Sequence, residues 1–148
     1  MNKITAFLIF AWIAILITVA YPNLAKSQGV LCGERSLILE TLHNTYGEVV
    51  TEQGVDDGLL IVITANTNKK WSFLITPKHK PHTFCVPATG NNWTQEENSS
   101  KGITHNGSVL TINYKNNGDW DMIYLDKNTG SIQSVTTGYA WERLVIIK

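Results

Sequence analysis

Near its start the chain has an unbroken apolar run, residues 4–20, between a positively charged beginning and a polar stretch. This order of charged, apolar and polar segments is typical of a secretory signal, and Ala25 and Ser27 supply the small residues that signal peptidase reads. We therefore expect cleavage after Ser27. An uncleaved membrane anchor is the alternative, because about 17 apolar residues is the lower limit for crossing a bilayer.

Between Glu34 and Gly47 the apolar positions follow the period of an α-helix. Ile38, Leu42 and Tyr46 recur at every fourth residue, which places them on one face. Glu34 suits the positive end of the helix dipole, and Gly47 stands where a left-handed residue commonly ends a helix. The spacing predicts a short amphipathic helix that ends at Tyr46.

After Gly47 the pattern changes to short runs rich in β-branched residues, separated by turn signals. The predicted strands cover residues 48–53, 59–65, 71–76, 83–86, 109–114, 120–125, 131–136 and 140–147. The run 59–65 is almost continuously apolar, which is typical of a strand buried on both faces. The Asn-Gly and Asp-rich turns between the later strands indicate an antiparallel meander.

The polar segment 88–101, rich in Asn, Ser and Glu, separates two halves of the chain. We expect an α+β protein with three parts. They are a signal peptide or membrane-anchor helix at 1–27, one short helix packed on an antiparallel β-sheet at 32–93, and a C-terminal β-meander at 101–148. About 50 residues is little for an independent core, so the meander is expected to pack on the first sheet or extend it.

Cys32 and Cys85 are the only cysteines, and the compartment decides how they are interpreted. In an oxidising compartment the pair favours a disulfide, whereas in the cytosol it would indicate two buried thiols. A bond would close a loop of about 54 residues and stabilise the fold by about 4 kcal/mol in the chain-entropy model. The leader favours export, so we expect the disulfide in a periplasmic or secreted protein. The alternative is a protein anchored to the inner membrane by its N-terminal segment.

The charge balance indicates no particular partner. Twelve Lys and Arg residues oppose twelve Asp and Glu residues, and removal of Lys3 and Lys26 with the leader leaves 10 against 12. No basic stripe remains for nucleic acid or anionic lipid. Membrane contact is expected only through residues 4–20 of an uncleaved leader.

His79 and His82 are the nearest approach to a metal site in the sequence. Two imidazoles three residues apart can ligate zinc or copper, but structural zinc sites need four ligands and catalytic sites need three. The neighbouring Lys78 and Lys80 repel a cation. We therefore expect a solvated loop, with no metal and no cofactor.

Asp119 and Asp121 flank Trp120 in an arrangement that sugar-binding surfaces use, with an indole for stacking and carboxylates for hydroxyl groups. A strand that alternates between core and solvent has the same pattern, so both interpretations stay open. Trp93 is the only large apolar residue of the polar segment 88–101. We expect these four residues to form the candidate binding surface.

Nucleophilic and nucleotide chemistry lack support in the sequence. No Gly-x-Ser-x-Gly motif or glycine-rich phosphate loop occurs, and a disulfide removes both thiols as nucleophiles. We therefore expect no catalytic residues and favour a protein that is not an enzyme.

The first half of the chain resembles a set of uncharacterised small exported proteins of alphaproteobacteria and their phages. The matching residues are Cys32-Gly33, Arg35, Ile38, Leu42, Tyr46-Gly47-Glu48, 58–65, Trp71-Ser72, Ile75, Cys85, Gly90 and Trp93. The resemblance covers residues 32–93 only and implies a fold and export, with no reaction attached. It fails at residues 78–82, where those proteins carry a short Asp/Asn-Gly turn, so this loop is peculiar to the present chain.

Together these patterns predict an exported, non-enzymatic module that binds an envelope protein or glycan through a sheet face or the Trp93 loop. An inhibitor of a cell-wall-degrading or proteolytic enzyme is the alternative, because small disulfide-linked β proteins often present a rigid loop. A small hydrolase is the third interpretation.

Overall fold

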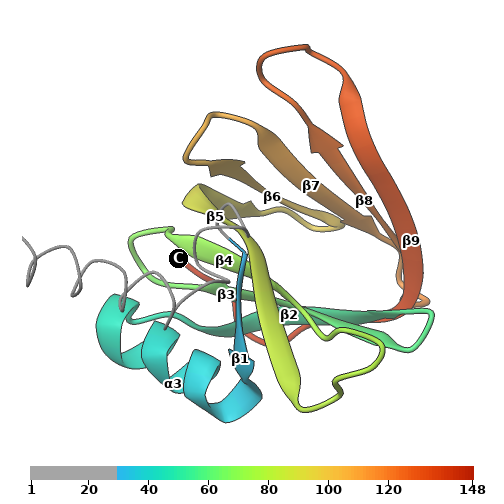
Figure 1. The fold of residues 1–148 in the computed structure, drawn as a ribbon. Helices are drawn as coiled ribbons and strands as arrows, with labels where there is room; N and C mark the ends of the chain where they lie inside the picture. The colour runs from blue at the N-terminus through green and yellow to red at the C-terminus, as the bar shows by residue number, and fades with distance from the viewer. Residues whose placement is uncertain (1–29) are drawn as a thin grey trace, which may run out of the picture. The chain divides into compact units, whose positions relative to one another are not determined.

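In the computed structural model, which describes residues 30–148, eight strands form a closed antiparallel barrel (Figure 1). Each barrel strand pairs with its neighbours in the chain, and β2 pairs with β9 to complete the circle. The barrel strands are β2 (Val49–Asp56), β3 (Leu59–Ala65), β4 (Trp71–Ile75), β5 (Thr83–Gln95), β6 (Ser99–Thr104), β7 (Val109–Tyr114), β8 (Trp120–Leu125) and β9 (Ile132–Arg143). A further strand, β1 (Leu31–Glu34), lies outside the barrel and pairs with β5.

The expected α+β fold class is wrong, because the described protein is mostly β. The sequence predicts a helix packed on an antiparallel sheet, with a meander that packs on that sheet or extends it. Instead, all eight strands form one sheet that returns to its first strand through the β2–β9 pairing. A single sheet that closes in this way leaves no free edge among its eight strands. The predicted N-terminal signal or anchor helix lies outside the described residues.

The segment predicted as a polar boundary, 88–101, is strand instead of loop. β5 continues through it to Gln95, and β6 begins at Ser99. Asn92 adopts a left-handed conformation with φ 58° where the β5–β6 register shifts. This bulge bends β5, so its first part pairs with β1 and β4 and its later part with β6.

The last two predicted strands, 131–136 and 140–147, are joined in one long strand that ends at Arg143, and residues 144–147 lie beyond it. β9 runs without a break from Ile132 to Arg143, past Gly138. Its partner β2 shifts register between Gln53 and Val55, and Ala140 has a positive φ of 55° nearby. The break expected between residues 136 and 140 is therefore absent, and β9 has a bulge between Tyr139 and Glu142 instead.

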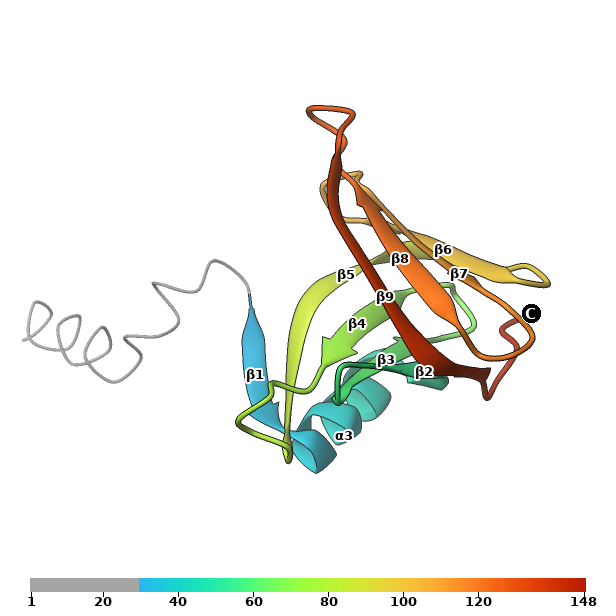
Figure 2. The same ribbon diagram turned by 90° about the vertical axis from the view of Figure 1, so that its right-hand side faces the viewer.

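The predicted helix is confirmed as α3 (Arg35–Tyr46), which ends at Gly47 in the left-handed conformation with φ 67°. Ile38 and Leu42 are its buried residues, and they pack on the outer face of the barrel. Their partners there are Val62, Leu74, Phe84 and Val86. β3 is therefore covered on both faces, as its apolar run predicted, with the barrel interior on one side and α3 on the other (Figure 2).

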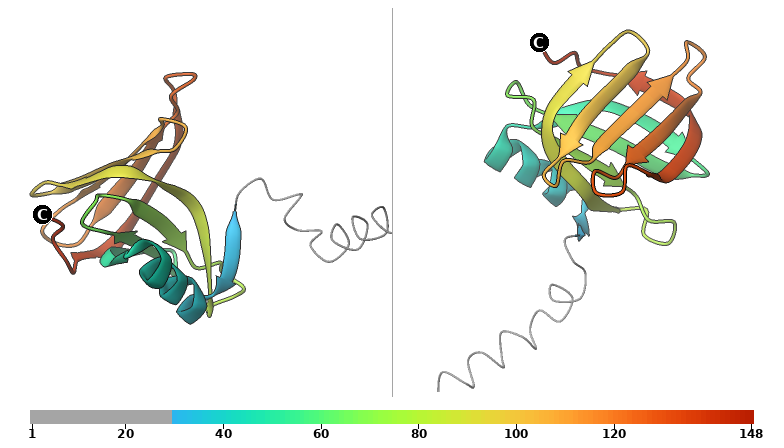
Figure 3. Two further views of the ribbon diagram at one scale, coloured as in Figure 1. Left: turned by 90° about the vertical axis from the view of Figure 1, so that its left-hand side faces the viewer. Right: turned by 90° about the horizontal axis from the view of Figure 1, so that it is seen from above.

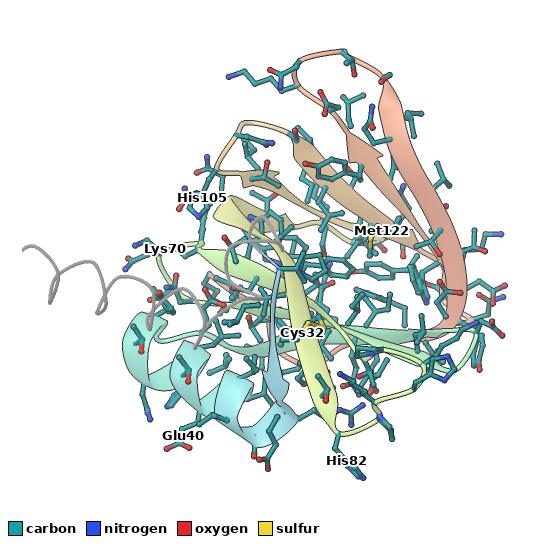
Figure 4. All side chains as sticks on the ribbon, in the orientation of Figure 1. Cys32, Glu40, Lys70, His82, His105 and Met122 are labelled. Atoms are coloured by element: carbon teal, nitrogen blue, oxygen red, sulfur yellow. A yellow bond between two sulfur atoms is a disulfide. The ribbon has the colours of Figure 1, made fainter. Side chains whose placement is uncertain are left out.

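Four tryptophans fill the barrel interior together with aliphatic residues of the surrounding strands. Trp71 and Trp93 lie 5.4 Å apart between ring centroids, and Trp120 and Trp141 lie 5.3 Å apart. The other members of this core are Ile61, Ile63, Ala65, Leu110, Ile112 and Met122. Met122 is seen inside the barrel in Figure 4.

The interior rings pack against glycines of neighbouring strands. A Cβ atom on Gly102 would lie 2.3 Å from the Trp71 ring, and one on Gly138 would lie 2.4 Å from the Trp120 ring. A Cβ atom on Gly54 would lie 2.4 Å from Trp141. Because such separations are shorter than any normal contact, these three positions accept no larger residue while the indoles stay in place.

The predicted disulfide is confirmed. Cys32 on β1 and Cys85 on β5 are paired in register, and their sulfur atoms are bonded. A structural disulfide indicates that the protein folds in an oxidising compartment outside the cytoplasm. Among the described residues, no helix has the length and apolar character needed to cross a membrane.

We expect replacement of both cysteines by serine to lower the free energy of unfolding by about 4 kcal/mol or less, because the open chain regains loop entropy. The bond lies on β1 and the first part of β5, so the interior tryptophans are expected to stay packed. Urea unfolding followed by tryptophan fluorescence measures both effects. If the tryptophans of the serine variant were exposed in buffer without urea, the barrel would need the disulfide in order to close, and this prediction would be wrong.

Candidate functional site

The strands β7, β8 and β9 frame a surface cleft of about 410 Å³. Asp119, Asp121 and Asn113 contribute polar atoms to it, and Trp120 also borders it. The remaining lining residues are Tyr114, Lys115, Thr137 and Gly138. The β7–β8 turn thus brings both predicted carboxylates and the predicted indole to one depression.

Hydrogen bonds within the chain hold the cleft's polar side chains in place. The Asn113 amide donates to Oδ1 of Asp121 across the β7–β8 pair at 3.0 Å. The Asn117 amide donates to Oδ2 of Asp119 at 3.0 Å. Within the described part of the chain, Oδ2 of Asp121 and Oδ1 of Asp119 accept no side-chain or backbone hydrogen bond. Each carboxylate therefore keeps an oxygen available for a ligand.

Trp93 and Trp120 belong to the barrel interior. Trp93 stands on β5 rather than on a loop, and its indole N–H donates to Glu52. The Trp120 ring is buried, and its N–H donates to the carbonyl of Tyr139 at 3.1 Å. Trp120 thus forms the floor of the cleft instead of a flat exposed platform, and Trp93 lies outside the cleft.

The histidines that stood nearest to a metal motif are exposed. His79 and His82 lie in the connection between β4 and β5, where the carbonyl of His82 accepts a hydrogen bond from the backbone of Arg35. No group of three potential metal ligands occurs among residues 30–148. Figure 4 shows His82 and His105 on different parts of the surface.

A second polar cluster, which the sequence did not reveal, surrounds Glu52 inside the barrel. Glu52 is fully buried, and the Ser100 hydroxyl donates to its Oε1 at 2.7 Å. The indole N–H groups of Trp93 and Trp141 donate to its two oxygens at 3.2 and 3.4 Å. The Gln95 amide adds a fourth donor at 3.3 Å. This set satisfies a carboxylate that would otherwise be costly to bury.

Arg143 supplies the balancing positive charge. Its Nε lies 3.5 Å from Oε1 of Glu52, as an ionic contact without a hydrogen bond. Its Nη2 donates to the carbonyl of Glu96 at 2.6 Å and to the Ser100 hydroxyl at 3.1 Å. The pair therefore connects β2, β9 and the β5–β6 hairpin at one end of the barrel.

The Tyr114 ring lies 5.3 Å beneath the Arg143 guanidinium and connects this cluster to the cleft. Burial raises the pKa of the Tyr114 phenol, while the Arg143 charge lowers it and the Glu52 charge raises it. The phenol therefore stays protonated at neutral pH and can donate a hydrogen bond.

The chain after β9 bridges the same end of the barrel. The backbone N–H groups of Leu144 and Val145 donate to the carbonyl of Thr51 at 2.7 and 3.1 Å. The Gln95 side chain bonds Val145 and Ile147, and Ile147 packs on the interior core. Together with the ionic pair, these contacts fasten the barrel end and give the Glu52 cluster a structural role.

Glu48 is a second buried carboxylate, at the junction between α3 and β2. The Thr64 hydroxyl donates to its Oε2 at 2.5 Å. Burial raises the pKa of Glu48 above its ordinary value of 4.5, and hydrogen bonds from Thr64 and Ser72 and the charge of Lys70 oppose the rise. Its ionised form is therefore less favourable in the folded protein than in the unfolded chain.

For the Glu52 cluster, we expect Glu52→Ala to lower the free energy of unfolding by about 3–5 kcal/mol, because it leaves the Arg143 charge without its buried partner. Glu142→Ala removes a carboxylate from the exposed side of the same β2–β9 pair and serves as the control. We expect that change to cost less than about 1 kcal/mol. Urea unfolding measures both. Equal losses in the two variants would contradict the role assigned to Glu52.

For Glu48, the raised pKa predicts that stability falls as the pH rises from about 4.5 through the folded-state pKa, because the folded protein holds the proton more tightly. Each pKa unit of the rise corresponds to about 1.4 kcal/mol. Glu48→Gln should therefore stabilise the protein at pH 7 and have little effect below the ordinary pKa.

The measurement is urea unfolding on both sides of this pH range. Glu40→Gln changes an exposed carboxylate of α3 (Figure 4) and should leave the pH profile as it is. If Glu48→Gln kept the wild-type pH dependence, the assignment to Glu48 would be wrong.

Comparison with known proteins adds no relative to these observations: no protein-family model matches the chain, and searches of curated proteins and of solved structures found no significant match. The resemblance of residues 32–93 to small exported proteins therefore stays a prediction.

Proposed function

We propose that the protein is an exported, non-enzymatic binding module of the periplasm or cell envelope, and that it binds an envelope glycan in the β7–β9 cleft. The observation that carries the proposal is that Asp119 and Asp121 line one depression, each with an oxygen free to accept hydrogen bonds. Sugars present adjacent hydroxyl groups, and a carboxylate accepts hydrogen bonds from two such donors at once.

The composition of the cleft supports a polar, uncharged ligand over an ion. Lys115 lies with the two aspartates, and Asn113 and Thr137 offer neutral donors and acceptors. Trp120 and Tyr114 add apolar surface, as in small-molecule sites where a few polar groups fix the orientation of the ligand. Mixed donors and acceptors around an apolar floor match the two edges and the faces of a saccharide ring.

The barrel interior supports a surface site over an internal one. Barrels of eight strands either fill their interior with side chains or hold one small ligand there. Here the four tryptophans occupy the interior, and each indole N–H is bonded within the chain. The acceptors are the carbonyls of Asn91 and Tyr139 and the carboxylate of Glu52, which serves two rings. These rings are held in place by hydrogen bonds and stabilise the fold, so the interior has no room for a ligand.

Calorimetric titration with soluble oligosaccharides of N-acetylglucosamine and with fragments released from the cell envelope tests the proposal. We expect Asp119→Asn and Asp121→Asn each to weaken binding by about tenfold or more, because a hydrogen bond to a charged group contributes about 1.5–3 kcal/mol. Asp126→Asn is the matched control, since Asp126 bonds the backbone of its own turn.

Three results would contradict the proposal. The first is binding heat that is the same in the wild type and in the two aspartate variants. The second is cleavage of the oligosaccharide, and the third is inhibition of a wall-degrading enzyme by a protein that does not bind the saccharide. Cleavage would favour a hydrolase, and inhibition alone would favour an inhibitor.

A further inference from the structure

The outer face of β6–β9 carries two rows of side chains that the strand register aligns. Ile103 pairs with Val109, Val109 with Leu125, and Leu125 with Ile132. This first row is therefore aliphatic across all four strands. In the next row, Lys101 and Thr111 are followed by Ile123 and Val135. We call these six aliphatic residues the apolar face.

Four of the six residues of the apolar face are exposed and Val109 and Ile123 are half-buried, whereas the corresponding outer surface of β3–β5 is covered. Ile132 and Val135 are 58% and 60% exposed, and Ile103 and Leu125 are 39% and 40% exposed. On β3–β5 the helix α3 covers the outward apolar residues, whereas Figure 3 shows β6–β8 with no helix across them. A contiguous exposed apolar patch of this kind marks an interaction site.

The sequence of β8 also indicates a covered face. From Met122 to Leu125 every residue is apolar, although only Met122 and Tyr124 belong to the interior core. Strands with such continuous apolar runs are normally buried on both sides, as β3 is in this protein. The outward residues Ile123 and Leu125 fit a strand whose second face packs against another surface.

The surroundings of the apolar face favour a second copy of this chain as the occupant. The adjacent third row is polar, with Ser99, Asn113, Asp121 and Thr137, and forms a rim of the kind that borders interfaces. Lys101 and Asp121 lie on different strands of the same face, so a two-fold arrangement can place unlike charges opposite each other. The charge is nearly balanced, with 12 basic and 12 acidic residues in the full chain and 10 against 12 without the leader, so two copies have little long-range repulsion.

The size of the face sets the strength of the contact. Four strands at a spacing of about 4.8 Å and six residues at a rise of about 3.4 Å, which take in the two apolar rows and the polar third row, give a surface of about 19 by 20 Å. This is about half of the roughly 800 Å² that a standard interface buries on each partner. A reversible dimer with micromolar or weaker affinity fits this area better than an obligate one.

We propose that the protein forms a two-fold dimer through the apolar face of β6–β9. Two-fold dimers are the commonest symmetric assemblies, and their interfaces pair a surface with itself, as an aliphatic row permits. Asn113, Asp121 and Thr137 belong both to the polar rim of this interface and to the proposed glycan cleft. The dimer is measured without ligand, so its test does not depend on the outcome of the glycan titration.

Sedimentation velocity on the full chain, in the form recovered from the cells, tests the dimer across about 1 μM to 1 mM, the range expected for a small interface. We expect a concentration-dependent dimer in the wild type. Val135→Asp should shift the dimerisation constant at least about tenfold toward monomer, because it places a charge without a partner in the apolar face. Leu37→Asp makes the same change on the exposed side of α3, where Leu37 is 59% exposed, and should leave the dimer unchanged.

Circular dichroism of both variants confirms that the barrel is folded. A wild type that stays monomeric throughout the concentration range overturns the proposal, as does a dimer that survives Val135→Asp or that Leu37→Asp abolishes equally. If Val135→Asp prevents folding, the milder Val135→Thr is measured, and an unchanged dimerisation constant overturns the proposal.

Discussion

The pairing of β2 with β9 is the constraint on which the rest of the structure depends. It joins the start of the barrel to its end, and it places Glu52 beside Arg143 and Trp141. Without this pairing, β2 and β9 would each expose a row of unpaired backbone groups. The interior tryptophans would also lose the enclosure that the closed sheet provides. The buried ionic pair is therefore a consequence of closure and, through its bonds to the β5–β6 hairpin, a means of fixing it.

Local patterns in the sequence predicted individual elements but not how they assemble. The helix Arg35–Tyr46 and the strands at 59–65, 109–114 and 120–125 were predicted correctly, because their apolar period and their flanking turn residues agree. The continuation of β5 was missed because the segment 88–101 is rich in Asn, Ser and Glu, which is the composition of a loop, although it pairs within the barrel around a bulge at Asn92. Closure was missed because the pairing of β2 with β9 joins residues about 90 positions apart, and no local pattern reports such a contact.

The candidate site was predicted in part, for a physical reason. Asp119, just before β8, and Asp121 on β8 flank Trp120, so the period of a strand already places both carboxylates on the side opposite the indole. The same alternation directs the Trp120 ring inward, which makes it the floor of the cleft. The burial of Glu52 could not be predicted from the sequence, because its hydrogen-bond partners come from β5, β6 and β9. Its own strand, β2, has the alternating pattern of a half-polar strand at the surface. The structural role of Glu52 becomes visible only in the closed barrel, where its carboxylate points inward and meets its partners.

The packing of indoles on glycines restricts how this barrel can diverge. Trp71 packs on Gly102, Trp120 on Gly138 and Trp141 on Gly54. Each indole ring therefore occupies the space that a missing side chain leaves on another strand. A methyl group gained at Gly102 or Gly54 requires a smaller ring opposite it, and a smaller ring alone leaves a void. At Gly138 it would also meet the backbone carbonyl of Val55 at 2.1 Å, so no change of ring makes room for it. Among descendants of this sequence, Trp71 with Gly102 and Trp141 with Gly54 are therefore expected to change together or not at all, and Gly138 is expected to stay glycine. Such coupled substitutions would leave a recognisable trace of the barrel even where overall similarity has been lost.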